Sequence, residues 1–326
     1  MADLYPWLEP YRESLAAVMR QGRLPHALLL SGLPGMGKGA FADYLARMLL
    51  CESPSGKDAG PCDRCPGCVQ LTAGSHPDFF RVGIEDEATA IKVDQVRELS
   101  RRLGLSSHRG GYKVAVMDPA EAMNVNAANS LLKTLEEPAD NTVVVLVSAF
   151  PARLSATIRS RCQHVRIDTT DRDAARRWLA TQIPPGEAVA VYLQLANGAP
   201  LEARHLAEAD VIAARRTCFQ ALVGILDGNS GSLSLAQEWC RNEELREVGW
   251  LREWLMDLLR IRMTGHSGGV RSVDLLEELE SLAPRLDSRI MFGQLERINR
   301  VMRMAAGSLN RQLMTEDLLL AWAAQG

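Results

Sequence analysis

One short stretch combines glycines and a lysine at the spacing that phosphate chemistry needs. Residues 32–39 read GLPGMGKG, and the key members are Gly32, Gly35, Gly37 and Lys38. In a phosphate-binding loop the glycines let backbone N–H groups converge on phosphate oxygens, while the lysine reaches the β- and γ-phosphates. The next residue normally supplies a hydroxyl to Mg²⁺, but in this chain it is Gly39. The stretch therefore predicts a degenerate phosphate loop that lacks one part needed for ATP hydrolysis.

Four of the seven cysteines are spaced as ligands of one metal ion. They follow the pattern C-x10-C-x2-C-x2-C at Cys51, Cys62, Cys65 and Cys68. A C-x2-C pair brings two thiolates to one tetrahedral Zn²⁺, and the stretch 53–61, rich in Gly, Pro and Ser, can fold back as a knuckle. Four sulfurs leave no open position for catalysis. We expect a structural zinc module at about residues 51–75, because four unrelated thiols rarely have this spacing.

An acidic residue follows the apolar run from Tyr112 to Met117. Nucleoside triphosphatases place an aspartate that orients Mg²⁺ at such a strand end, and a glutamate that activates water comes next. Asp118 fits the first role, although a strand-end cap explains it equally well. Pro119 stands where the glutamate is needed, and Glu121 follows two positions later. We expect Glu121 to be displaced from the catalytic position.

Strands that alternate with helices must position these residues. Apolar runs predict strands at residues 27–30, 78–82, 112–117, 142–147 and 165–167, with helical segments between them. From residue 171 onward every segment has helical periodicity. Alternation followed only by helices predicts an α/β domain at residues 1–166, a small helical domain at 167–209 and an all-helical domain at 210–326.

The composition is that of an ordinary globular protein. Of the 326 residues, 47% are apolar and 24% are charged, and the net charge is −3. This charge gives no overall attraction to nucleic acid or to acidic membranes. The N-terminal residues are partly acidic and contain proline, unlike a signal peptide, and no apolar run is long enough to span a membrane. We therefore expect a cytoplasmic protein without a disulfide framework.

Several motifs together resemble one protein family. They are the loop GLPGMGKG, the four-cysteine insert after its helix, SHPDFF at 75–80, ANSLLKTLEEP at 128–138 and the triplet Ser160-Arg161-Cys162. In this combination the chain is similar to the bacterial clamp-loader subunits of the AAA+ superfamily, and the resemblance covers the whole chain. It implies an α/β AAA+ (P-loop) domain with a zinc-binding insert, a small helical lid domain and a C-terminal helical collar domain for oligomerisation.

The resemblance also implies an activity and partners. A clamp loader is a pentamer that uses ATP in its motor subunits (gamma/tau) to open the sliding clamp and place it on primed DNA. This chain would work beside gamma/tau and the delta subunit, as part of the DNA polymerase III holoenzyme. The resemblance assigns Arg161 to a neighbouring subunit's ATP site, where it would act in trans as an arginine finger.

The sequence departs from the motor subunits at three positions. Motor subunits keep a Thr or Ser after the loop lysine, an Asp-Glu pair at the strand end, and an Arg in the first turn of the lid helix. This chain has Gly39, Pro119 and Leu201 or a neighbour in those places, and Arg204 lies near the lid position but out of register. The resemblance therefore implies a non-hydrolysing, stator-like subunit in which ATP binding is doubtful.

Two other classes of function remain open. One is an active motor ATPase of the same family, and the other is a zinc-containing adapter that binds DNA. For the adapter, the only local argument is a group of basic residues, which more often form a solvated face: Arg101, Arg102, His108 and Arg109. ATP turnover by the purified chain tests the first class, and a clamp-loading assay with and without the chain tests the assembly role.

Overall fold

The computed structural model of the chain describes residues 4–53, 60–86, 88–168, 171–185, 188–241, 245–304 and 311–324. Two compact units are present, namely Met1–Thr181 with Ala199–Glu202, and Gln182–Gly198 with Ala203–Gly326. Part of the predicted zinc module, residues 54–59, lies outside the described residues. The predicted division into three domains stays a prediction.

A five-stranded parallel sheet organises the first unit. In the spatial order β2-β3-β4-β1-β5, its strands are β1 (Ala27–Ser31), β2 (Phe79–Val82), β3 (Lys113–Met117), β4 (Thr142–Ser148) and β5 (Gln163–Arg166). Every residue of β1, β3 and β4 is buried, as expected for apolar strands of a parallel sheet covered on both faces. Ser31 of β1 pairs with Ser148 of β4, so the stretches that follow these strands meet at one edge. Ligands bind open α/β sheets at this carboxyl edge.

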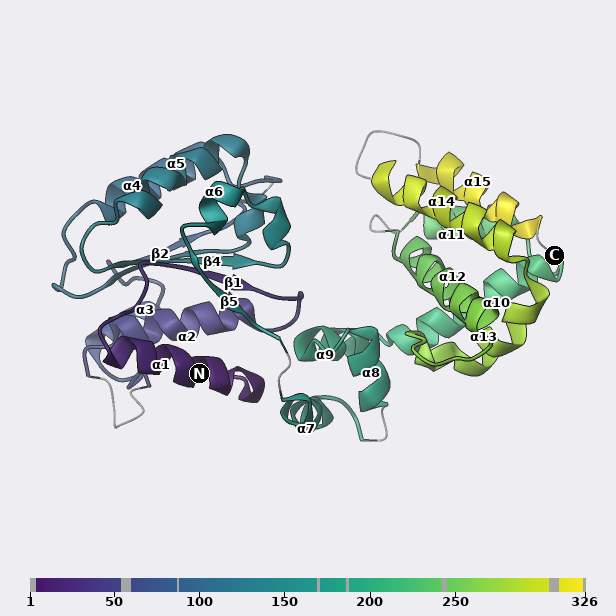
Figure 1. The fold of residues 1–326 in the computed structure, drawn as a ribbon, viewed down its shortest axis with the longest axis horizontal. Helices are drawn as coiled ribbons and strands as arrows, with labels where there is room; N and C mark the ends of the chain where they lie inside the picture. Colours follow the sequence, from purple (N-terminus) through teal and green to yellow (C-terminus); the bar gives the residue numbers. More distant parts are fainter. Residues whose placement is uncertain are drawn as a thin grey trace. The chain divides into compact units, whose positions relative to one another are not determined.

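Helices cover both faces of this sheet (Figure 1). One face carries α1 (Glu9–Arg20), α2 (Lys38–Leu50) and α3 (Pro66–Thr72), and the other carries α4 (Val93–Leu103), α5 (Val125–Glu136) and α6 (Ala156–Arg159). Short 3-10 turns are η1 (Pro6–Leu8), η2 (Ala120–Ala122) and η3 (Pro151–Arg153). In α4 the residues Val96, Leu99 and Leu103 fall on one side and are buried, so its apolar periodicity explains its packing.

Helices alone build the second unit. The helices that follow the sheet are α7 (Arg172–Gln182), α8 (Val189–Leu195), α9 (Pro200–Glu208), α10 (Val211–Leu226), α11 (Ser232–Trp239), α12 (Arg246–Thr264), α13 (Leu276–Leu282), α14 (Ser288–Met304) and α15 (Arg311–Ala323), with turns η4 (Val273–Leu275) and η5 (Ala283–Arg285). Nearly all of α7 and the start of α9 belong to the first unit. Trp239, Trp254 and Trp322 are buried in the hydrophobic core of the second unit.

None of the helices in the described parts of the chain has the length and apolar composition to cross a bilayer.

The predicted architecture, an α/β domain followed only by helices, is confirmed. All five strands differ from the predicted runs at their ends by one or two residues: β1 and β4 end one residue later than predicted, and β3 begins one residue later. β2 begins at Phe79, one residue later than predicted, and β5 begins at Gln163, two residues earlier. The early start of β5 follows from its pairing, because Gln163 lies beside Leu28 of β1.

A buried arginine ties together three segments of the second unit. Arg215 on α10 is 2% exposed, and its guanidinium donates to Asp274 at 2.8 Å, Glu253 at 3.1 Å and the Ser272 hydroxyl at 3.0 Å. Its Cζ lies 5.4 Å from the centre of the Trp254 ring. The Asp274 side chain is 1% exposed. Loss of the guanidinium would therefore leave a buried, unpaired carboxylate.

We expect Arg215→Met to lower the free energy of unfolding of the second unit by about 3–5 kcal/mol, because removing one partner of a buried ion pair leaves the other uncompensated. Chemical denaturation followed by tryptophan fluorescence measures the change. The double variant Arg215→Met/Asp274→Leu is the control, and it should recover much of the loss. An unchanged denaturation midpoint in the single variant would contradict this role for Arg215.

Candidate functional site

The glycine-rich loop joins β1 to α2, as the sequence predicts. Gly37 caps α2 with a φ of 84°, a left-handed conformation that glycine adopts without strain. Lys38 begins the helix and is 7% exposed, and its Nζ donates to the Leu33 carbonyl at 2.7 Å. Burial lowers the pKa of Lys38, while the carboxylates of Asp118 and Glu121 act in the opposite direction. The lysine therefore points into its own loop and has two acidic groups nearby.

Two other loop glycines lie against the chain itself. A Cβ on Gly35 would stand 2.6 Å from the backbone nitrogen of Glu202, and the N–H of Leu201 donates to the Gly35 carbonyl at 3.1 Å. A Cβ on Gly32 would stand 2.1 Å from the carbonyl oxygen of Ile167. The start of α9 and the residue after β5 thus require glycine at these positions. Their presence does not by itself indicate a bound phosphate.

Three aromatic rings pack at the loop. Trp7 is fully buried, and its indole N–H donates to the Met36 carbonyl at 3.0 Å. The Trp7 ring stacks on Tyr5 with centroids 4.9 Å apart and meets Trp178 edge to face at 5.0 Å. A Cβ on Gly37 would stand 3.0 Å from the Tyr5 ring. The N-terminal segment and α7 therefore brace the loop, a contact that the sequence pattern did not predict.

Gly39, which stands where a Mg²⁺-binding Ser or Thr is expected, lies next to the carboxylate of Asp118. A Cβ on Gly39 would stand 2.8 Å from Oδ2 of Asp118, closer than side-chain carbons normally approach. Asp118 follows β3, as predicted. Burial raises the pKa of Asp118, while the positive charges of Arg81 and Lys38 lower it. A threonine or serine in place of Gly39 would therefore require the Asp118 side chain to move.

Glu121 lies in η2, and its carboxylate accepts hydrogen bonds from the backbone that follows β4. Its Oε1 accepts the N–H groups of Ala149 at 2.9 Å and Phe150 at 3.2 Å, just beyond β4. The Ser148 hydroxyl also accepts the N–H of Phe150, at 3.2 Å. One oxygen of the Glu121 carboxylate thus serves as a cap for a strand end.

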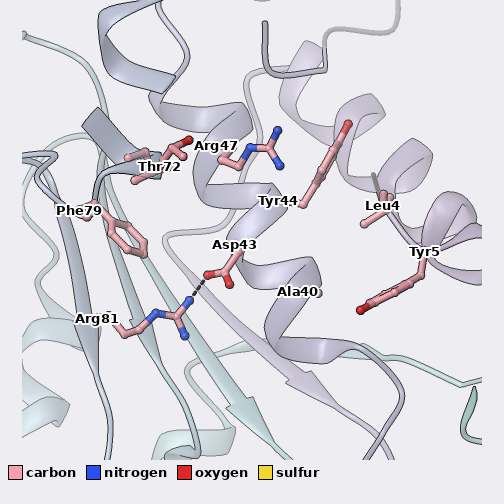
Figure 2. A pocket seen from close by; sticks show the side chains of 11 residues that line it. Leu4, Tyr5, Ala40, Asp43, Tyr44, Arg47, Thr72, Phe79 and Arg81 are labelled. Carbon is pink, nitrogen blue, oxygen red and sulfur yellow. Dashed lines mark hydrogen bonds and ion pairs between the residues drawn. The ribbon is translucent and has the colours of Figure 1, made fainter. Parts of the chain in front are cut away.

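A cavity of about 680 Å³ opens on the exposed side of α2 (Figure 2). Its lining comes from the N-terminal segment, α2, α3, the residues just after α3, and β2, and includes Tyr44 and Phe79. Arg81 of β2 forms an ion pair with Asp43 of α2 at this cavity. No residue of the stretch 32–39, all of which the structure describes, lines it. The glycine-rich loop itself therefore does not line the cavity, although Tyr5, which packs against Gly37, does.

The four clustered cysteines come together, as predicted. Their sulfur atoms all lie within 4.8 Å of one another, and Cys65 and Cys68 are buried. The N–H of Cys62 donates to Sγ of Cys51, and the N–H of Cys65 donates to Sγ of Cys62, both at 3.3 Å. Hydrogen bonds of this kind orient metal-binding side chains. The donor set fits a tetrahedral ion that prefers sulfur.

Two of these thiols have pKa values shifted in opposite directions. The backbone N–H groups of Arg64 and Cys65 lower the pKa of Cys62 to about 6. Burial raises the pKa of Cys68 to about 12. A divalent cation would hold both as thiolates, because its charge stabilises the deprotonated form of a buried sulfur. The chemistry of the cluster is therefore consistent with a metal site.

Arg161 lies in the turn between α6 and β5, at the opposite edge of the sheet from the loop. β5 runs parallel to β1, with Gln163 beside Leu28 and Arg166 beside Ser31. The 4 residues of β5, at roughly 3.3 Å each, place Arg161 about 13 Å or more from the level of the loop. The Arg161 side chain is 33% exposed. A role beside phosphates would therefore require the ATP site of another chain.

Three of the four basic residues that favoured a DNA-binding adapter form ion pairs within the chain. Arg101 and Arg102 on α4 both form ion pairs with Glu98, at 2.7 Å and 3.0 Å. Arg109 forms an ion pair with Glu52. These acidic partners offset the local positive charge, so the structure adds no support to the adapter.

Comparisons with known proteins give consistent results along the chain. The family described as "DNA polymerase III, delta subunit" matches residues 8–171, and the one described as "DNA polymerase III, delta subunit, C terminal" matches residues 209–324. A DNA polymerase III subunit delta' from Pseudomonas aeruginosa is 36% identical over 330 residues, which cover 99% of this chain and 98% of the relative. The Escherichia coli K12 subunit delta' is 36% identical over 323 residues, covering 97% and 94%. The tau subunit of Escherichia coli K12 is 34% identical over 166 residues, covering 51% of this chain and 25% of tau.

Proposed function

Because this chain belongs to the family of DNA polymerase III delta' subunits, we propose that it works in the clamp loader as a non-hydrolysing stator. One observation carries the proposal: Gly39 has no hydroxyl for Mg²⁺, and even a Cβ there would stand 2.8 Å from Oδ2 of Asp118. Lys38 is retained, but it donates to the Leu33 carbonyl of its own loop. This arrangement favours a subunit that assembles with ATP-hydrolysing neighbours over an active motor ATPase.

We expect ATP to bind weakly, if at all, to the degenerate loop of Gly32, Gly35, Gly37 and Lys38. The contacts of the loop with its own chain support this expectation. The start of α9 bonds to the Gly35 carbonyl, and the indole of Trp7 bonds to that of Met36. A nucleotide would have to compete with these contacts for the loop.

In the assembled loader, Arg161 is proposed to supply an arginine finger to a neighbouring motor subunit. A planar guanidinium with several donors stabilises the negative charge on the γ-phosphoryl oxygens in the transition state. The position of Arg161 supports this role, because it is partly exposed and lies far from the loop of its own chain. The proposed recipients are the gamma/tau motor subunits, and about half of this chain is similar to a tau subunit.

The remaining parts of the proposal concern the assembly. The chain is proposed to bind gamma/tau and the delta subunit, and to reach the sliding clamp and primed DNA through the complex. Residues 1–166, 167–209 and 210–326 would then act as P-loop domain, lid and oligomerisation collar. A replication role of this kind places the chain in the cytoplasm.

Omission of the chain tests the stator role. A loader reconstituted from the other subunits alone should fail to load clamps on primed DNA, and addition of the purified chain should restore loading. Full loading without the chain would contradict the proposal, whatever the ATPase rates.

We further propose that the four-cysteine cluster holds one structural Zn²⁺. Cys51, Cys62, Cys65 and Cys68 would occupy all four tetrahedral positions, so the metal would fold the insert and catalyse nothing. Cys65 is also the N-cap of α3, so its metal bond would tie the start of that helix to the insert.

Purified protein should contain about one zinc per chain, and Cys65→Ser should lose it because three sulfurs hold Zn²⁺ far more weakly than four. Elemental analysis measures the metal, and limited proteolysis should show new cleavage within residues 51–75 while the rest stays folded. Cys240→Ser, outside the cluster, is the matched control and should keep its zinc. A metal-free wild-type preparation with a protease-resistant insert would contradict the proposal.

A further inference from the structure

The guanidinium of Arg161 is held by its own chain on both terminal nitrogens. Nη2 forms an ion pair with Oε1 of Glu136 at 2.5 Å. Nη1 donates to the Thr157 carbonyl at 3.0 Å, within the same turn of chain as Arg161. Glu136 belongs to α5, so the ion pair links the arginine to a different element. These two contacts fix a side chain that would otherwise sample many rotamers.

Glu136 occupies a position that its own helix does not favour. It is the last residue of α5, where the negative end of the helix dipole repels a carboxylate. Its side chain is 48% exposed, so burial does not explain it either. The contact with Arg161 supplies a reason for an acidic residue at this helix end.

We propose that Glu136 is a positioning residue for Arg161, holding its guanidinium ready for the phosphates of a neighbouring ATP site. This inference rests on the proposed finger role of Arg161. A guanidinium has five N–H donors, so the contacts to Glu136 and Thr157 leave donors for phosphate oxygens. Fixing the side chain before the neighbour docks reduces the conformational entropy lost when the finger engages.

An ion pair that merely joins α5 to the turn after α6 would look the same in the structure. The two roles differ in how the variants combine. A positioning residue acts only through Arg161, so its loss has no further effect once the guanidinium is gone. A structural link acts on the whole subunit, and its loss lowers activity in either background.

The test uses the complete clamp loader with ATP, clamp and primed DNA. Glu136→Gln should lower kcat by about 3- to 10-fold with little change in KM, because a misoriented finger affects the transition state more than ATP binding. Glu137→Gln removes the same charge from the next residue, which is also exposed, and should change kcat by less than about 2-fold. Glu136→Asp keeps the charge and should retain more turnover than Glu136→Gln.

The double variant distinguishes a positioning role of Glu136 from a purely structural one. Arg161→Ala/Glu136→Gln should be no slower than Arg161→Ala alone. Equal turnover of wild type and Glu136→Gln in fully assembled complexes, equal turnover of the Asp and Gln variants, or an additive loss in the double variant would each overturn the positioning role. Unchanged turnover in Arg161→Ala would instead overturn the finger role itself, so the two failures are distinguishable.

Discussion

Arg161→Ala, in an otherwise intact clamp loader, should lower ATP turnover at the neighbouring site by about 10³-fold or more, the range typical of arginine fingers. The guanidinium places a fixed positive charge where negative charge spreads over the γ-phosphoryl oxygens, and a methyl group cannot replace it. Loss for the whole complex will be smaller, because other motor sites keep their own fingers. The measurement is ATPase stimulated by DNA and clamp, together with clamp loading.

Controls must separate a lost finger from a lost assembly. Size-exclusion chromatography should show that the variant complex forms, because Arg161 is partly exposed and its ion pair with Glu136 is not buried. Arg153→Ala is the matched control. Arg153 lies in η3, shortly before α6, and packs over the Phe150 ring at 4.6 Å. Its loss should leave turnover nearly unchanged. Wild-type rates in an assembled Arg161→Ala complex would leave Arg161 with a structural role only.

Short sequence patterns correctly predicted the core strands of the sheet and the cysteine cluster. The apolar runs located the core strands because a parallel sheet buries its strands on both faces. The cysteine spacing located four sulfurs that lie within 4.8 Å of one another, because C-x2-C geometry is set by a few neighbouring residues. Features encoded over short stretches of chain were therefore readable from the sequence.

Contacts between segments far apart in the sequence could not be predicted from such patterns. Leu201 bonds to Gly35, and Trp178 packs on Trp7, although about half the chain separates each pair. Neither periodicity nor spacing reports such pairs, because they depend on how whole elements pack. The aromatic pair Tyr5 and Trp7, flanked by Leu4 and Leu8, was a signal of burial, but not of what the rings would cover.

The purified chain alone should hydrolyse ATP at least roughly 10³-fold more slowly than a motor subunit under the same conditions, because each missing catalytic group removes a large part of the transition-state stabilisation. Gly39 offers no hydroxyl to Mg²⁺, and Pro119 offers no carboxylate to water. Steady-state phosphate release measures the rate. Lys38→Ala is the control for contaminating ATPase, because activity that survives loss of the loop lysine does not come from this chain.

The variant Gly39→Thr is a stricter test of the same prediction, because it restores the hydroxyl that normally binds Mg²⁺ after the loop lysine. The new Cβ would stand 2.8 Å from Oδ2 of Asp118, so the threonine fits only if that carboxylate rotates away. Even then Pro119 stands where motor subunits carry the glutamate that activates water, and Glu121, two positions later, is held at the end of β4 by the N–H groups of Ala149 and Phe150. We therefore expect Gly39→Thr to hydrolyse ATP no faster than wild type. A rate approaching that of a motor subunit, abolished by adding Lys38→Ala, would show that the loop needs only a hydroxyl to work as an ATPase.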